Sequence, residues 1–275
     1  MKLSIITINY NNIEGLKETV YSVLEQNAFN DFEYIIIDGG SSDGSKEFIE
    51  KCDRIDYWVS EADSGVYNAM NKGIKVATGE YCIFMNSGDV FYDKDVLKNV
   101  FRYNLSEDFV VGNHFSKGKI NKAPENITAF DIFYNALCHQ SVFIKTKILK
   151  DDPYDETLSL VADWKHMFEW LALKNATYKH IDIVICKYDN TGMSSKQWKL
   201  VRQEREDVKK KLLPQRIYED YNSLKLQKEL QNYNPSLYEA LKIVSPGGFD
   251  NKIILSIIKL KRISAIIISS IKKKK

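Results

Sequence analysis

Acidic side chains follow two short apolar runs of this chain, each at the point where a buried strand would end. Asp38 comes directly after residues 34–37, and Asp89 closes a polar turn after the uninterrupted run at residues 81–85. Open α/β sheets bind ligands in the crevice outside the carboxyl ends of their strands. The two acids are therefore candidates for binding a polar ligand. The alternative is a turn in which Asp hydrogen-bonds its own backbone.

A third acidic loop leads into a helix that carries further polar groups. Glu61 and Asp63 precede residues 66–77, whose apolar positions recur at helical spacing and predict an amphipathic helix with Gly79 as its C-cap. The polar face of this helix carries Asn68, Asn71 and Lys72. Three loops are thus expected to converge on one rim of the molecule.

The elements that position these loops alternate between strand and helix. Residues 3–8 predict a first strand, and after Asn12, a suitable N-cap, apolar residues recur at helical spacing. The strand at residues 34–37 is followed by another helical pattern. This alternation predicts an α/β fold with parallel βαβ winding. No G-x-G-x-x-G follows the first strand, so the dinucleotide-binding fingerprint is absent.

The second half of the chain changes character after a last predicted strand at residues 181–186. Residues 199–241 are charged and helix-prone, with breaks at Pro214 and Pro235, which predicts a helical extension and not a second catalytic domain. The predicted organisation has three parts: a domain of residues 1–200, a helical extension of residues 201–250 and a basic tail of residues 251–275.

The charge of the chain is concentrated at its carboxyl end. Residues 252–275 hold eight basic residues and no acidic one, against a net charge of +2 for the whole chain, so the preceding residues carry a net charge of −6. That mildly acidic body argues against nucleic acid as a partner. The apolar stretches of the tail are far shorter than the roughly 20 residues needed to cross a bilayer. Its isoleucines and basic charge favour attachment to anionic lipid; a helix packed on the domain or on a partner is the alternative.

Composition and cysteine spacing bear on the compartment. The chain has 275 residues, of which 44% are hydrophobic and 28% charged, as in ordinary soluble globular proteins. The apolar start at residues 3–8 is too short for a signal peptide. The spacing of the cysteines fits neither a zinc site nor a disulfide framework, and predicts reduced thiols; they are Cys52, Cys82, Cys138 and Cys186. A cytoplasmic location is expected.

Six motifs in a fixed order resemble those of one enzyme family. They are IITINYN (residues 5–11), IIIDGGSSDGS (35–45), EADSGVYNAMNKGI (61–74), FMNSGD (84–89), CHQSVF (138–143) and the Asp163-Trp164 pair. Together they resemble family 2 glycosyltransferases of the GT-A fold, most of all the branch that builds bacterial surface polysaccharides such as O-antigen and capsule. The resemblance implies a Rossmann-like, mixed and mostly parallel sheet flanked by helices. It also implies a nucleotide-binding first half and an acceptor-binding second half.

The resemblance assigns a nucleoside-diphosphate sugar as donor and carries binding roles onto matching positions. Thr7, Asn9 and Tyr10 match the end of the first strand, which packs on the base. Asp38 matches an Asp that hydrogen-bonds the base, and the family often has a second Asp where this chain has Gly39. Contacts to the nucleotide and sugar are implied for Glu61, Asp63, Asn71 and Lys72, and donor binding for Asn86 and Ser87.

Histidines divide into one that matches a family motif and three that do not. His139 and Gln140 match a pair near the active site that touches the donor diphosphate or the acceptor; a hydrogen-bonded histidine at a strand entry is the alternative. The others are expected at the surface or half-buried: His114, His166 and His180.

The metal motif departs from the family pattern. Family members usually have Asp-x-Asp-Asp or Asn-Ser-Asp-Asp where this chain has Asn86-Ser87-Gly88-Asp89. Mg²⁺ or Mn²⁺ held by a carboxylate and by phosphate oxygens would neutralise the charge of a leaving diphosphate. One protein carboxylate suffices when the diphosphate supplies further oxygens, so Asp89 is the predicted metal ligand. Gly88 in place of an acid motivates an alternative function, a nucleotide-sugar-binding protein with little or no turnover.

Asp163 matches the catalytic base of the family. A positioned carboxylate takes the proton of a sugar hydroxyl as that hydroxyl attacks C1, and direct attack inverts the anomeric centre. The alternative for Asp163 is a helix N-cap or first-turn acid. The predicted enzyme transfers a sugar from a donor, preferably a UDP-sugar, to a lipid-linked or oligosaccharide acceptor, and its tail binds the cytoplasmic face of the inner membrane. A nucleotidyltransferase is a weaker alternative, because asparagines replace the basic Gly-rich loop that such enzymes place after the first strand.

Overall fold

The computed structural model describes residues 2–28, 31–188 and 196–244 of the chain. The chain divides into two compact units, Met1–Val208 and Lys209–Lys275. The basic tail predicted at residues 251–275 lies outside the described residues, and so does the turn expected after the last strand at residues 189–192.

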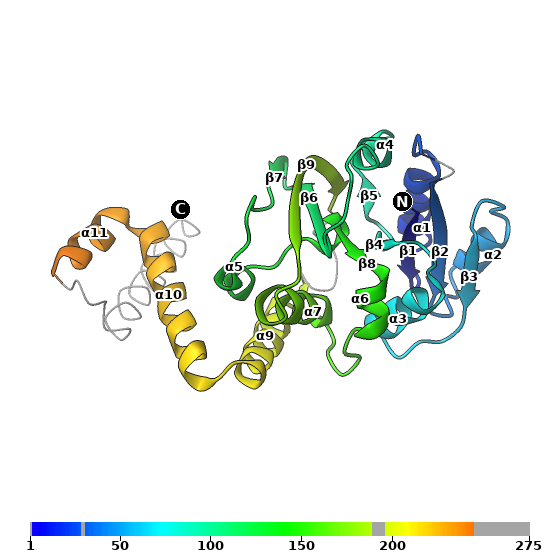
Figure 1. Ribbon diagram of the computed structural model, residues 1–275. Helices are drawn as coiled ribbons and strands as arrows, with labels where there is room; N and C mark the ends of the chain where they lie inside the picture. The colour runs from blue at the N-terminus through cyan, green and yellow to red at the C-terminus, as the bar shows by residue number, and fades with distance from the viewer. Residues whose placement is uncertain (1, 29–30, 189–195, 245–275) are drawn as a thin grey trace, which may run out of the picture. The chain divides into compact units, whose positions relative to one another are not determined.

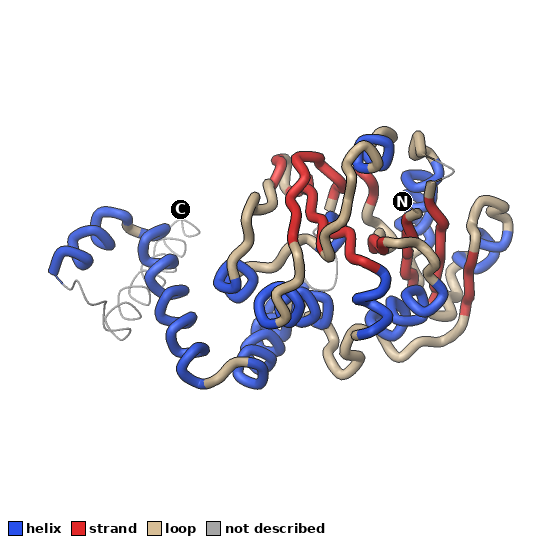
Figure 2. The backbone as a smooth tube through the Cα atoms, in the orientation of Figure 1, coloured by secondary structure: helices blue, strands red, loops and turns tan. Residues whose placement is uncertain are grey.

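A mixed sheet forms the centre of the first unit (Figures 1 and 2). Its nine described strands lie in the order β3-β2-β1-β4-β8-β6-β9-β5, and β7 pairs with β6. They are β1 (Leu3–Asn9), β2 (Phe32–Asp38), β3 (Tyr57–Ser60), β4 (Tyr81–Phe84), β5 (Val90–Phe91), β6 (Phe109–Ser116), β7 (Lys119–Asn121), β8 (Val142–Lys145) and β9 (Tyr178–Lys187). Strands β3, β2, β1 and β4 run parallel, whereas β8 is antiparallel to both of its neighbours. The predicted α/β fold is confirmed.

Helices cover both faces of this sheet. Those of the first unit are α1 (Ile13–Leu24), α2 (Ser45–Glu50), α3 (Val66–Val76), α4 (Val96–Val100), α5 (Ala129–Tyr134), α6 (Thr146–Asp151), α7 (Ala162–Phe168) and, beginning in this unit, α9 (Trp198–Leu212). Two short helical turns complete them, the 3₁₀ turn η1 (His139–Ser141) and the π-helical turn η2 (Glu169–Leu173).

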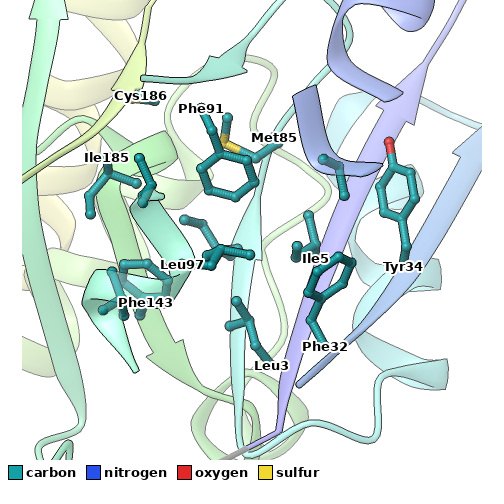
Figure 3. Close-up of a cluster of buried hydrophobic side chains, with 14 of the residues drawn as sticks. Leu3, Ile5, Phe32, Tyr34, Met85, Phe91, Leu97, Phe143, Ile185 and Cys186 are labelled. Atoms are coloured by element: carbon teal, nitrogen blue, oxygen red, sulfur yellow. The ribbon is translucent and has the colours of Figure 1, made fainter. Parts of the chain in front are cut away.

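Two apolar cores lie on opposite faces of the sheet, and β1 contributes to both. Every residue of β1 is buried. Leu3 and Ile5 pack with α1 and α4 in one core (Figure 3), and Ile6 and Ile8 pack with α3, α6 and α7 in the other. Successive side chains of a strand point to opposite faces, so a continuous apolar run is what a strand covered on both sides requires.

The parallel register brings the polar ends of these strands to one rim. Asn9 at the end of β1 pairs with Asp38 at the end of β2, and Asp38 pairs with Ser60 at the end of β3. The turn after β4 joins the same rim, because the Ser87 backbone N–H donates to the Ile8 carbonyl oxygen.

One predicted helix boundary is confirmed and another is wrong. Asn12 is the N-cap of α1, and its side chain accepts a hydrogen bond from the Gly15 backbone N–H. Helix α3 ends at Val76 with Ala77 as its cap, so Gly79 is not the C-cap. The backbone of Gly79 instead approaches β1 closely: a Cβ at Gly79 would lie 2.5 Å from the Ser4 backbone nitrogen.

Helices of the extension predicted at residues 201–250 continue in the second unit, which begins at Lys209. Helix α10 (Gln215–Tyr233) follows Pro214, and α11 (Pro235–Val244) begins at Pro235, where the missing N–H of proline costs no intrahelical hydrogen bond. Among the described residues, no helix is long and apolar enough to cross a membrane.

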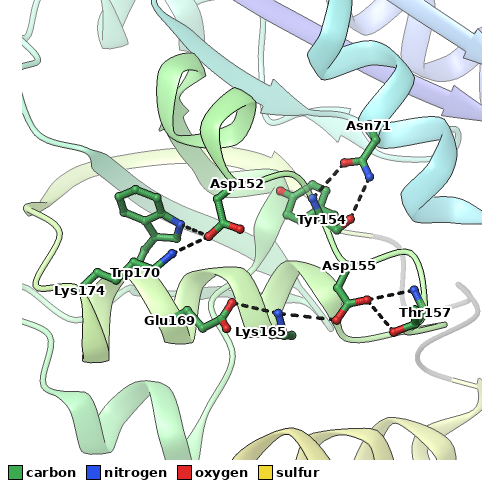
Figure 4. Close-up of polar contacts among 9 residues, drawn as sticks. All are labelled: Asn71, Asp152, Tyr154, Asp155, Thr157, Lys165, Glu169, Trp170 and Lys174. Atoms are coloured by element: carbon green, nitrogen blue, oxygen red, sulfur yellow. Dashed lines mark hydrogen bonds and ion pairs between the residues drawn. The ribbon is translucent and has the colours of Figure 1, made fainter. Parts of the chain in front are cut away.

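Polar contacts anchor α7 to the rest of the first unit (Figure 4). The Asp152 carboxylate accepts hydrogen bonds from the Trp170 indole N–H and from Lys174 Nζ. Lys165 on α7 lies 3.0 Å from Glu169 and 3.6 Å from Asp155. These contacts fix the helix that begins beside Asp163.

His166 on α7 is buried, and the expectation that it lies at the surface or half-buried is wrong. It is 2% exposed, and its ring lies 5.4 Å from the ring of Tyr154. Neither ring nitrogen has a hydrogen-bond partner among the described residues. Burial lowers the pKa of His166 to about 4; nearby Asp152 opposes this effect, while Lys174 and Lys165 add to it.

We expect His166 to make the fold sensitive to acid. Its folded pKa lies below its unfolded value of about 6.5, so the unfolded chain binds a proton more readily and stability falls as the pH drops from about 6.5 to about 4. The difference between the two pKa values corresponds to a loss of about 3 kcal/mol in the free energy of unfolding. His166→Phe keeps the aromatic contacts and should abolish this loss, as measured by urea unfolding at pH 7 and pH 4. Equal losses in the two proteins would contradict this role of His166.

Candidate active site

Asn9 ties together the ends of three strands. Its Nδ2 donates to Asp38 Oδ1 at 2.8 Å, and its Oδ1 accepts a hydrogen bond from Ser87 Oγ at 2.7 Å. Thr7, two residues earlier on β1, is fully buried and donates to the Met85 carbonyl oxygen. Asn9 and Thr7 therefore hold β1, β2 and the turn after β4 in one arrangement.

The Asp38 carboxylate is fully buried and holds its own loop. Beyond Asn9 it accepts hydrogen bonds from the Ser41 backbone N–H, the Ser41 hydroxyl and the Ser60 hydroxyl. Burial alone would raise the pKa of Asp38, but the hydrogen bonds from Ser41, Ser60 and Asn9 outweigh it and keep the pKa below its ordinary value. Asp38 thus shapes the rim as an ionised group, and its contact with a base stays a prediction.

Asp63 occupies the space beside Gly39. A Cβ at Gly39 would lie 2.5 Å from Asp63 Oδ2 and 3.2 Å from the ring of Tyr10. Tyr10 is 67% exposed, so its ring is available to a ligand. The carboxylate that the family often carries at position 39 is therefore absent, and the carboxylate of Asp63 lies at that place.

We expect Gly39→Ala to weaken donor binding by moving Asp63. The new methyl group would displace a flexible carboxylate, so stability should change little, whereas the KM for the donor should rise about tenfold with the loss of one charged hydrogen bond. Steady-state kinetics would measure this. In an Asp63→Ala background the same substitution should have no further effect; an equal effect in both backgrounds would exclude Asp63 as the cause.

The remaining predicted residues of this half contact one another or the loop before α7. Lys72 Nζ lies 2.8 Å from Glu61 Oε1 and donates to the Ala62 carbonyl oxygen. The Asn71 amide donates to the Tyr154 carbonyl oxygen and accepts from the Tyr154 backbone N–H (Figure 4). It also donates to Glu156. Asn71 therefore joins α3 to the chain that leads into α7.

The turn after β4 requires glycine at position 88. Gly88 has a φ of 101°, a backbone conformation that L side chains rarely adopt. Its N–H donates to the Thr19 hydroxyl and to the Gly15 carbonyl oxygen, which fixes the turn against α1. The absence of the usual acid at Gly88 therefore follows from the shape of the turn.

Asp89 is buried behind this turn and contacts η1. It is 6% exposed, and its Oδ2 accepts a hydrogen bond from Gln140 Nε2 at 2.9 Å. Among the described residues, no group of three or more histidine, cysteine, aspartate or glutamate side chains could hold a metal ion. Asp89 fits a divalent ion as one hard oxygen ligand, and a bound diphosphate would have to supply others.

Asp163 lies in the first turn of α7 and receives two side-chain contacts. His139 Nδ1 lies 3.2 Å from its Oδ2, and the Tyr67 hydroxyl donates to its Oδ1 at 2.8 Å. Tyr67 was not among the predicted site residues, although it lies within the family-like motif of residues 61–74. Tyr67 and Asp163 are 96 residues apart in the sequence, and only the fold brings them into contact.

The contact between His139 and Asp163 fixes the charge of both groups. Burial alone would lower the pKa of His139, but its hydrogen bond with Asp163 and the charge of that carboxylate raise it to about 9. Burial would raise the pKa of Asp163, but His139 and Tyr67 together keep it below its ordinary value. At neutral pH the pair is an imidazolium and a carboxylate.

Asn86 contacts the other side of the His139 ring. Its Nδ2 lies 3.2 Å from His139 Nε2, while its buried Oδ1 has no hydrogen-bond partner among the residues described. A protonated imidazole donates from both nitrogens. Rotating the Asn86 amide by 180° would make Oδ1 the acceptor of the hydrogen bond from His139 Nε2.

Consecutive residues of η1 contact the two carboxylates predicted to act in the site. His139 contacts Asp163, and Gln140 contacts Asp89. The predicted base and the predicted metal ligand therefore belong to one polar cluster, although they are far apart in the sequence. Two surface cavities, of about 480 and 310 Å³, lie elsewhere along β9, and neither is lined by Asp89 or Asp163.

The sequence and the fold both match known proteins. Residues 4–153 match the family model described as Glycosyl transferase family 2. An uncharacterised glycosyltransferase of Mycobacterium tuberculosis is 31% identical over 207 residues, which span 70% of this chain and 77% of that protein. TuaG of Bacillus subtilis, named as a candidate teichuronic acid biosynthesis glycosyltransferase, is 25% identical over 217 residues. These span 73% of this chain and 84% of TuaG.

Solved structures confirm the GT-A fold. S. aureus TarS 1–349 in complex with UDP has a TM-score of 0.62 at 20% identity and covers 84% of this chain and 72% of that chain. The mannosyltransferase PcManGT from Pyrobaculum calidifontis, in complex with GDP-Man and Mn²⁺, has a TM-score of 0.62 at 14% identity. The match covers 96% of this chain and 80% of PcManGT. The family model covers more than half of the chain, and a relative above 30% identity spans more than two thirds of it, so the chain belongs to glycosyltransferase family 2.

Proposed function

We propose that this protein is a metal-dependent, inverting glycosyltransferase that moves a sugar from a UDP-sugar to a hydroxyl group of a lipid-linked glycan. The proposal rests on one observation: two consecutive residues of η1 each contact one of the two carboxylates. His139 contacts Asp163, and Gln140 contacts Asp89. One carboxylate is suited to receiving a proton, and the other to holding a cation beside a diphosphate.

Asp163 is the proposed general base. Tyr67 contacts Oδ1 of Asp163, and His139 contacts Oδ2. Each of these oxygens can accept a further hydrogen bond. An acceptor hydroxyl bound there would give its proton to Asp163 while its oxygen forms a bond to C1 of the donor sugar. The bond from C1 to the diphosphate oxygen breaks on the opposite side, which inverts the anomeric configuration.

Tyr67 and His139 act on this step by holding Asp163. The lowered pKa of Asp163 keeps the carboxylate ionised and ready to accept a proton at neutral pH. The protonated His139 carries a positive charge near both Asp163 and Asp89, where a diphosphate would add negative charge. The positions of these groups are set before substrate binds, which lowers the cost of organising the transition state.

Asp89 is the residue that would hold Mn²⁺ or Mg²⁺, and Gln140 orients its carboxylate. A bound divalent ion would neutralise the charge that grows on the leaving diphosphate. The named ligands of the structural relatives support this assignment, since UDP was bound to TarS and Mn²⁺ with GDP-Man to PcManGT.

The relatives and the tail support the proposed acceptor class. One relative is named for teichuronic acid biosynthesis and others for PGL/p-HBAD biosynthesis, which supports a role in building bacterial surface glycans. The basic, isoleucine-rich residues 251–275 are proposed to bind the cytoplasmic face of the inner membrane, where a lipid-linked acceptor would be reached.

A panel of nucleotide sugars tests this function. The release of nucleoside diphosphate is measured for each donor with Mn²⁺ and with EDTA, both with and without lipid-linked glycan acceptors. We expect one UDP-sugar to give release that depends on Mn²⁺ and rises with acceptor. Tight donor binding without release under any condition would instead identify a nucleotide-sugar-binding protein.

A further inference from the structure

Arg205 on α9 brings a positive charge close to the proposed base. Its guanidinium carbon lies 5.2 Å from the centre of the Trp164 ring, and Trp164 directly follows Asp163 in the chain. Burial lowers the pKa of Arg205, and the charge of the Asp163 carboxylate opposes this effect. Arg205 therefore belongs to the surroundings of Asp163, although the two residues are on different helices.

The surface that holds Arg205 is fixed on both sides. The Trp164 indole N–H donates to the Ile132 carbonyl oxygen, which locks the ring beneath the guanidinium. Glu204, the neighbour of Arg205, accepts hydrogen bonds from the backbone N–H groups of Ser159 and Leu160. This part of α9 is thereby attached to the loop that enters α7.

Arg205 has hydrogen-bonding capacity that the described chain does not use. Its Nε is buried and has no hydrogen-bond partner within residues 2–28, 31–188 and 196–244, and no carboxylate in those ranges lies within 4.0 Å to form an ion pair. A guanidinium offers five N–H donors and keeps its charge in proteins, and leaving buried donors unpaired is costly. The guanidinium of Arg205 is planar and charged, and it forms no ion pair with Asp163. Such a group is suited to binding an anion through two parallel hydrogen bonds.

The position of Arg205 distinguishes between the two substrates. Arg205 lies over the ring of Trp164, the chain neighbour of Asp163, and the charge of Asp163 acts on it. The diphosphate of the donor is expected at Asp89, and the acceptor hydroxyl at Asp163. An anion bound by Arg205 would therefore lie on the acceptor side of the site.

We propose that Arg205 binds a carboxylate or phosphate group of the acceptor, next to the hydroxyl that Asp163 deprotonates. The inference rests on the proposed function and adds that the acceptor is anionic. It makes Arg205 a determinant of acceptor specificity, because a neutral sugar would leave its buried Nε–H without a charged partner.

Matched pairs of small molecules that differ in one anionic group test this assignment. Binding is measured by isothermal titration calorimetry to the full-length protein loaded with UDP and Mn²⁺, with p-nitrophenyl β-glucuronide against p-nitrophenyl β-glucoside, and glycerol 3-phosphate against glycerol. We expect the charged member of at least one pair to bind about 10- to 100-fold more tightly than its neutral partner. Arg205→Gln should abolish that preference, and Arg205→Lys should restore part of it.

Arg202→Gln is the matched control, because Arg202 is an exposed residue on the same helix. It removes one positive charge and should leave the preference intact. The affinity for UDP should be unchanged in all three variants. Equal binding of the charged and neutral members by the wild-type protein would overturn the proposal, whatever the variants do. A loss of UDP affinity in Arg205→Gln, with the acceptor preference retained, would place the anion on the donor and would also overturn it.

The donor panel separates this inference from the function on which it rests. If no donor is turned over, the glycosyltransferase function fails and the acceptor role of Arg205 fails with it. If a donor is turned over but the charged acceptors have no advantage, only the role of Arg205 is wrong.

Discussion

Asp163→Asn is expected to lower the rate of sugar transfer by a factor of about 10² to 10⁴, the usual contribution of a general base. The amide has nearly the shape of the carboxylate, and its oxygen can still accept one of the hydrogen bonds from Tyr67 and His139. It cannot take the proton of the acceptor hydroxyl at neutral pH. The loss should appear in kcat, with the affinity for the donor unchanged, because Asp163 is proposed to act on the acceptor.

Tyr67→Phe is the matched control for this prediction. It removes one hydrogen bond to Asp163 and leaves the carboxylate in place. A hydrogen bond from a hydroxyl to an ionised carboxylate is worth about 1.5 to 3 kcal/mol, so the rate should fall by no more than about 100-fold. Near-normal transfer by Asp163→Asn, in a protein whose melting temperature is retained, would show that Asp163 is not the base.

Asp89→Asn is expected to remove the dependence of the reaction on divalent metal. The amide oxygen can still accept the hydrogen bond from Gln140, so the fold should be retained. Without the negative charge, the site holds the ion poorly, and the several kcal/mol of charge stabilisation that a bound metal supplies would be lost. Turnover should fall by about 100-fold or more, and added Mn²⁺ should no longer restore it in a titration after EDTA treatment.

Asp53→Asn serves as the control for Asp89, because Asp53 is an exposed acid of the first unit. Its removal changes the net charge by the same amount and should leave the Mn²⁺ titration unchanged. If Asp89→Asn kept the wild-type titration, another group would be the metal ligand.

The local sequence predicted most of the framework correctly because strand and helix patterns are local. The apolar run at residues 3–8 and the helical spacing after Asn12 predicted β1 and α1, and the breaks at Pro214 and Pro235 predicted α10 and α11. Gly79 misled the prediction. Glycine is common where a helix ends, but it is also needed where two backbones come close, and only the position of β1 shows which applies.

The environment of single polar residues was harder to predict. His166 has no motif partner, and nothing in the local sequence shows that Tyr154 and its neighbours enclose it. The role of Gly39 was likewise hidden, since the place of the missing acid is taken by Asp63 from a different loop. Both cases depend on the packing of segments that are remote in the sequence.

The sequence by itself predicted the α/β class and the polar rim at the strand ends, since these depend on residue type and short-range spacing. Its resemblance to family 2 glycosyltransferases implied the candidate base and the candidate metal ligand. Only the tertiary structure decided that His139 pairs with Asp163, that Gln140 pairs with Asp89, that Tyr67 contacts Asp163 and that Arg205 lies over Trp164. The physical reason is that such contacts require the register of the sheet and the docking of α7 and α9, which arise when remote segments bury their apolar faces together.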